Sequence, residues 1–146
     1  MRALHFFTLL LASMGLLAAA TDEQYLDSKD VQILLKTTHF GFGSVGMGPN
    51  VPEGEAALRR IMQKDDAMQF LLPVFEHGTA EGKCYALVGF RLLSPKHFEA
   101  SCQRLARWNN ITINTVSGCI VDKTKLAEVV QTIQAGTYDS EALGRR

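Results

Sequence analysis

The sequence predicts a mainly α-helical protein of stacked antiparallel helical hairpins, similar to HEAT repeats, with one short strand-like segment before a C-terminal helix. Three observations support this fold class. Apolar residues recur at helical spacing through most of residues 52–138. Glycine, threonine and Ser-Pro signals divide that stretch into consecutive helices. β-Branched residues gather after Asn109, where the strand-like segment is expected.

The first predicted hairpin spans residues 52–77. Pro52 suits the first position of a helix, and Glu55 follows in the first turn, where a negative charge complements the helix dipole. A second helix begins at the aspartate pair 65–66. Pro73 predicts a kink or an early end within it, because a proline inside a helix removes a hydrogen bond. The apolar faces are formed by Ala57, Leu58, Ile61 and Met62 and by Ala67, Met68, Leu71, Leu72 and Phe75.

The second predicted hairpin spans residues 79–108. Thr79 caps a helix over EGKCYALVGFRLL, in which residues 84–90 are apolar on every side. A helix of that kind lies at the centre of a bundle, although a buried strand is the alternative for such a run. Ser94-Pro95 then starts a helix whose apolar face carries Phe98, Cys102 and Leu105. Two hairpins with no clear internal repeat are too few to define a solenoid.

The two ends of the chain are predicted from composition. Residues 21–51 form an N-terminal segment and glycine-rich linker, and the apolar run within residues 21–40 does not distinguish helix from strand. After the extended segment ITINTVSGCIV, Asp122 caps a last helix. We expect residues 52–138 to form the folded domain and the polar residues 139–146 to form a flexible tail.

Residues 41–46, GFGSVG, match the G-x-G-x-x-G pattern of dinucleotide-binding loops. Such a loop needs a helix that starts within it and points its free N–H groups at the pyrophosphate. Pro49 and Pro52 follow instead, and the next helix is expected only from Pro52. We therefore interpret the glycines as a mobile connector and expect no cofactor.

The first twenty residues, MRALHFFTLLLASMGLLAAA, have the three parts of a secretory signal peptide. Arg2 supplies the positive charge, an apolar stretch follows, and three alanines precede a cleavage site before Thr21. The apolar stretch is shorter than the roughly 20 residues of a spanning helix. We therefore expect removal of residues 1–20, export to the periplasm or the exterior, and a mature protein without a membrane span.

Charge argues against two classes of partner. The chain holds 15 Lys and Arg residues against 15 Asp and Glu residues, and they are mixed along the sequence. Nucleic-acid-binding proteins usually carry a basic stripe. Since no such stripe is visible, we expect neither nucleic acid nor an anionic membrane surface as a partner.

The segments EGEAALRRI, GKCYALVGFRLL, SGCIVDKTKLAEVVQTI and AGTYD occur in this order. Through them the chain resembles an uncharacterised family of small exported bacterial proteins, sometimes labelled as similar to a microcin-maturation protein. The resemblance covers about residues 40–139. It implies a bacterial envelope location and a compact α-rich domain, and it implies no reaction and no catalytic residue.

Three cysteines in an exported protein allow one disulfide and leave one thiol, in any of three pairings. If the helices before and after Ser94 form a hairpin, Cys84 and Cys102 lie about 3 Å out of register along its axis. A bridge between them then fits the Cα separation of a disulfide, and we favour it over pairs with Cys119. The alternative is three buried thiols that act as small apolar residues.

Cys119 lies in the turn-like sequence SGC and is the candidate reactive thiol. A neighbouring histidine would make it a nucleophile for acyl transfer or hydrolysis. However, no spacing places His39, His77 or His97 beside it, and these isolated histidines predict no metal site. We therefore expect a non-catalytic binding or structural module with a protein partner. A small thiol-dependent enzyme using Cys119 is the alternative.

Overall fold

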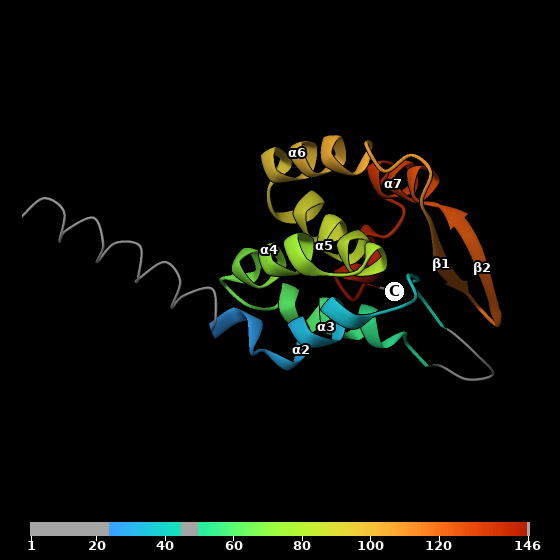
Figure 1. Ribbon diagram of the computed structural model, residues 1–146. Coiled ribbons are helices and arrows are strands. Elements are labelled where there is room, and N and C mark those ends of the chain that lie inside the picture. Colours follow the sequence, from blue (N-terminus) through green and yellow to red (C-terminus); the bar gives the residue numbers. More distant parts are fainter. Residues whose placement is uncertain (1–23, 45–49, 146) are drawn as a thin grey trace, which may run out of the picture.

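The computed structural model describes residues 24–44 and 50–145. The predicted signal peptide with its cleavage site, and Gly46 of the glycine-rich stretch, lie outside the described residues. No helix within the described residues is long and apolar enough to cross a membrane. The elements, labelled as in Figure 1, are α2 (Lys29–Lys36), α3 (Glu53–Met62), α4 (Ala67–His77), α5 (Ala80–Leu93), α6 (Pro95–Leu105), β1 (Thr112–Ser117), β2 (Ile120–Lys125), α7 (Leu126–Gln134) and α8 (Asp139–Ala142).

The fold is mainly helical, as the sequence predicts, and the predicted strand-like segment before α7 is a two-stranded antiparallel sheet. Helix α5 lies at the centre and contacts α2, α3, α4, α6, α7, α8 and β1 (Figure 1). All residues from 82 to 90 are buried, which confirms a central helix and contradicts the strand alternative. Thr79 caps this helix as predicted, because its Oγ1 accepts a hydrogen bond from the Gly82 N–H at 3.1 Å.

A glycine at position 89 allows α4 to approach α5 closely. A Cβ atom on Gly89 would lie 2.3 Å from Leu71 Cδ1, so a larger residue would push the two helices apart. Helix α4 packs more extensively on α5 than on α3, and α5 packs in turn on α6. Successive helices therefore form hairpins that share α5 as their common partner.

Helix α4 continues for another turn beyond Pro73, so the early end predicted at this proline is wrong. Val74 and Phe75 are buried in the core and stabilise that turn. The Lys83 ammonium group donates to the carbonyl oxygens of Phe75 and Glu76, at 3.0 Å in the second case. These are among the carbonyls that the end of a helix leaves without an internal partner.

Strands β1 and β2 form a hairpin in which Ser117 faces Ile120 across a two-residue turn. Gly118 begins the turn with φ +58°, a conformation that glycine adopts at little cost. The cap predicted at Asp122 is wrong, because Asp122 lies in β2 opposite Thr115 and α7 begins four residues later. Pairing with β1 decides the conformation of this segment.

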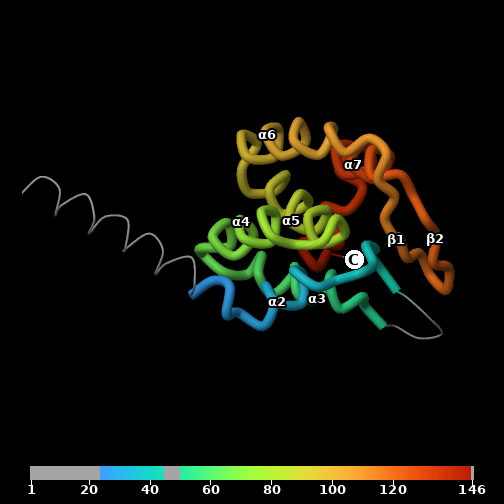
Figure 2. The backbone as a smooth tube through the Cα atoms, in the orientation of Figure 1, coloured from blue at the N-terminus to red at the C-terminus, as the bar shows by residue number. Residues whose placement is uncertain are grey.

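The N-terminal segment belongs to the core and is not a separate linker. Helix α2 buries Val31 and Leu34, and Phe40 lies beside β1 in a parallel bridge. The Phe40 N–H donates to Asn114 O and the Val116 N–H donates to Phe40 O, both at 2.8 Å. Figure 2 shows this segment running from α2 to the hairpin.

The C-terminal segment also differs from the flexible tail that its composition predicts. Residues Asp139–Ala142 form α8, which contacts α3 and α5. Ala142 is buried, and the Asp139 carboxylate accepts a hydrogen bond from Arg91 Nε at 3.1 Å. These tertiary contacts order a segment that is polar in sequence.

Candidate functional site

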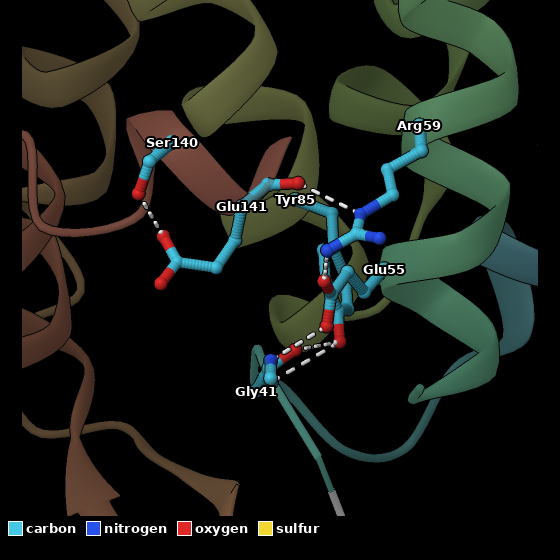
Figure 3. A network of polar contacts seen from close by, with 7 residues as sticks. Gly41, Glu55, Arg59, Tyr85, Ser140 and Glu141 are labelled. Atoms are coloured by element: carbon cyan, nitrogen blue, oxygen red, sulfur yellow. Dashed lines mark hydrogen bonds and ion pairs between the residues drawn. The ribbon is translucent and has the colours of Figure 1, made fainter. Parts of the chain in front are cut away.

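A buried carboxylate on α3 belongs to the polar network drawn in Figure 3. The Glu55 side chain is 0 % exposed, and it pairs with Arg59 one turn later on the same helix. Its Oε2 accepts a hydrogen bond from the Gly43 N–H at 2.7 Å. Arg59 Nε donates to the Glu141 carbonyl at 2.7 Å. The ion pair therefore joins α3 both to the segment after α2 and to α8.

Tyr85 adds a second anchor from α5. Its hydroxyl donates to Gly41 O at 2.8 Å and accepts from the Gly41 N–H at 3.1 Å. Burial raises the pKa of Tyr85, so the phenol stays protonated near neutral pH. Gly54 makes room for the ring, because a Cβ atom there would lie 2.5 Å from Tyr85 Cε2. The Phe40 and Phe42 rings pack on Tyr85 with centroid distances of 4.9 and 5.4 Å.

Tyr85 also lines an open pocket of about 580 Å³, which we name the α2–α3 pocket. Its size falls within the range of small-ligand sites, about 300–1,000 Å³. The charged groups have both signs, since lysines come from α2 and a glutamate comes from the first turn of α3. The lining includes Lys29, Ile33, Lys36, Thr38, Glu53 and Tyr85. The arrangement offers a fixed, mixed-charge surface for non-covalent binding.

The sequence gives little warning of this network. Glu55 and Arg59 have the i,i+4 spacing of a helical ion pair, but that spacing is most often found on exposed surfaces. Nothing local indicates that Glu55 is buried or that the Gly43 N–H meets it. Tyr85 appears in the sequence as one member of an apolar run, and its hydroxyl partner lies 44 residues away.

All three cysteines lie within the described residues and are free, so the predicted Cys84–Cys102 bridge is absent from the structure. The two thiols lie in different surroundings. Cys84 is fully buried in the core, whereas Cys102 is 8 % exposed and borders a surface pocket together with Gln134 of α7. Burial raises the pKa of both thiols, which makes them poor nucleophiles. Cys119 is exposed in the hairpin turn.

The structure does not bring the candidate thiol and the histidines together. The His39 ring lies 3.0 Å from Thr38 Oγ1, and the His97 ring lies 2.8 Å from Ser94 Oγ. Within residues 24–44 and 50–145, no histidine makes a hydrogen bond to Cys119, and no group of three His, Cys, Asp or Glu residues is placed to hold a metal ion. Among the described residues, Cys119 therefore has no hydrogen-bonded histidine to act as its base.

No protein-family model, curated protein sequence or solved structure matches this chain. The fold and the site therefore define only a class: a mainly α-helical domain with an open pocket that shares Tyr85 with a buried polar network.

Proposed function

We propose that this chain is an exported, non-catalytic binding module of the bacterial cell envelope. The observation that supports a binding role is the α2–α3 pocket, which has a wall fixed in advance. Tyr85 is held by both polar groups of Gly41, and the neighbouring Glu55 is held by Arg59 and the Gly43 N–H. A wall that is already ordered loses little conformational entropy when a partner binds.

The export part of the proposal rests on the signal-peptide pattern of residues 1–20. Cleavage before Thr21 would leave every described residue in the mature protein. Mass spectrometry of the protein from the periplasmic fraction is expected to give Thr21 as its first residue. Recovery of the protein only from the cytoplasm, with residues 1–20 still attached, would contradict export.

The binding part can be tested by filling the pocket. Thr38 is exposed at its edge, and Thr38→Trp places a large ring there without a buried substitution. Gln69→Trp, at an exposed position of α4 outside the pocket, is the matched control. We expect envelope proteins captured by the wild-type chain to be lost with Thr38→Trp and retained with Gln69→Trp.

Cys119→Ser separates the binding module from the alternative, a small thiol-dependent enzyme. Capture of the same envelope proteins by Cys119→Ser, in the same amounts, is expected for a binding module. Capture that depends on the thiol, or a covalent adduct at Cys119, would favour the enzyme. Capture that Thr38→Trp leaves unchanged would show that the α2–α3 pocket is not the binding site.

A further inference from the structure

A second, smaller pocket lies where the ends of α4 and α6 meet the first turns of α5. It has a volume of about 170 Å³ and is lined by Phe75, Lys83, Arg104, Leu105, Arg107 and Trp108. We name it the Trp108 pocket. It shares no lining residue with the α2–α3 pocket, so it is a separate site.

Lys83 places a buried positive charge at this pocket. The residue is 8 % exposed, and its ammonium group donates to the carbonyl oxygens of Phe75 and Glu76. An ammonium group has three N–H donors, so one remains beyond these two carbonyls. Desolvation lowers the pKa of Lys83, and the charge of Glu76 opposes this effect. A carboxylate in the pocket would compensate the Lys83 charge further.

The other charged groups of the pocket leave an excess of positive charge. Arg104 is already paired, because its Nη1 and Nη2 atoms contact Glu76 at 2.5 and 2.9 Å. Arg107 is exposed and makes no side-chain hydrogen bond or ion pair with any residue that the structure describes. Lys83, Arg104 and Arg107 therefore line the pocket, and Glu76 is the carboxylate that neutralises one of these charges. This local excess of positive charge occurs in a chain of formal net charge zero.

Two aromatic rings lie close to the Lys83 ammonium group. Lys83 Nζ lies 5.7 Å from the centroid of the Trp108 ring and 5.6 Å from that of Phe75. Trp108 is 39 % exposed, a high value for so large an apolar side chain. The cavity volume equals that of about five or six water molecules at roughly 30 Å³ each. It therefore admits a single carboxylate-bearing side chain or chain end.

We propose that the Trp108 pocket binds a single carboxylate group of a polypeptide partner. The free guanidinium group of Arg107 matches a carboxylate with two parallel hydrogen bonds. Lys83 supplies the buried charge below it, and Trp108 offers an apolar contact for the chain that carries the carboxylate. The carboxylate comes either from an Asp or Glu side chain or from a C-terminus. This assignment goes beyond the α2–α3 pocket and does not depend on it.

Trp108 makes the test direct, because it is the one tryptophan of the chain and lies in the pocket. Its fluorescence is followed while the mature protein is titrated with an oligoglutamate peptide blocked at both ends. A neutral peptide with a free C-terminus, a blocked oligolysine and inorganic phosphate are titrated in parallel. We expect a saturable change with at least one of the two carboxylate peptides, weakened by added salt, and none with oligolysine.

Arg107→Gln removes the free guanidinium at an exposed position and is expected to weaken peptide binding about tenfold. Arg145→Gln removes an equally exposed arginine far along the sequence and is expected to leave binding unchanged. Saturation with only the free C-terminus identifies a chain end as the source of the carboxylate, and saturation with oligoglutamate identifies a side chain. Any of three results would overturn the proposal. Neither carboxylate peptide saturates the protein, or Arg107→Gln binds the peptide as tightly as the wild type does, or phosphate binds as tightly as the peptide.

Discussion

Glu55 shows how one buried charge is accommodated in this protein. An isolated carboxylate in the core would be costly, but Glu55 meets both the Arg59 guanidinium and the Gly43 N–H. Because the hydrogen-bonded carboxylate joins segments distant in sequence, its removal should disturb the wall of the α2–α3 pocket as well as the core.

We expect Glu55→Gln to lower the free energy of unfolding by about 3 kcal/mol, because breaking a buried pair leaves the other charge unpaired. The Arg59 side chain is 21 % exposed, and this partial contact with water keeps the loss in free energy of unfolding small for a buried ion pair. The double variant Glu55→Gln/Arg59→Met should lose less than the sum of the single variants. Urea unfolding measures all three.

Arg60→Met is the matched control on the same helix. Arg60 pairs with Asp30 at 2.7 Å, but its side chain is 50 % exposed, so the loss should stay below about 1 kcal/mol. Strict additivity of the Glu55 and Arg59 changes would contradict the inference that the two residues act as a pair.

The cysteines give a second prediction at the scale of single residues. Cys119 is exposed, whereas Cys84 and Cys102 are buried and their pKa values are raised by burial. In the native protein without reductant, a thiol reagent is expected to modify Cys119 alone. After unfolding in denaturant, all three thiols should react. Reaction of a single thiol after unfolding would instead show that a disulfide forms, as the sequence suggests for Cys84 and Cys102.

At the scale of elements, α4 and α6 are joined across the Trp108 pocket by Glu76 and Arg104. The pKa of Glu76 is lowered, chiefly by the hydrogen bond that its carboxylate accepts from Arg104. A carboxyl group whose pKa is lower in the folded than in the unfolded protein stabilises the folded state. This contribution is complete at pH values above the pKa of the unfolded state and is lost as pH falls through the pKa of the folded state. The link between these two helices is therefore expected to weaken in acid.

Arg104→Gln tests this link. Both side chains are about half exposed, so we expect a loss of about 0.2–1 kcal/mol near neutral pH. The difference between variant and wild type should shrink as pH is lowered and Glu76 becomes protonated in both proteins. Urea unfolding over this pH range measures it. A difference that is independent of pH would mean that Arg104 acts through packing on Phe75 and not through Glu76.

At the scale of the whole molecule, the segment before the glycine-rich stretch is part of a single core. Val31, Leu34 and Phe40 are at most 1 % exposed and lie in the same cluster as the side chains of α5. Burial of side chains of this size contributes about 1.5–3 kcal/mol each. Together they approach the total stability of a typical domain, about 5–15 kcal/mol.

We therefore expect a chain that starts at residue 45 to fail to fold, whereas a chain that starts at Thr21 folds. Circular dichroism melting distinguishes the two, because only the longer chain should show a cooperative transition. A cooperative transition in the shorter chain would show that residues 24–44 are dispensable for folding.

The helical elements follow from local signals. Pro52, Thr79 and Ser94-Pro95 mark helix starts that the structure confirms to within a residue, because capping and proline geometry act within one turn. The run around Cys84 is apolar on all sides, and it forms the central helix. The hairpin is only partly predictable, since β-branched residues indicate strands but do not reveal that Asp122 pairs with Thr115.

The sequence by itself determined a mainly helical domain, the starts of α3, α5 and α6 and the choice of α5 as the central helix, because periodicity and caps depend on neighbouring residues. Only the tertiary structure decided that Glu55 is buried, that Phe40 joins the hairpin, that the Cys84 and Cys102 thiols stay free, and that Lys83 and Arg107 line one pocket. Burial and contact between distant segments depend on how the helices pack around α5, and no local pattern encodes that packing.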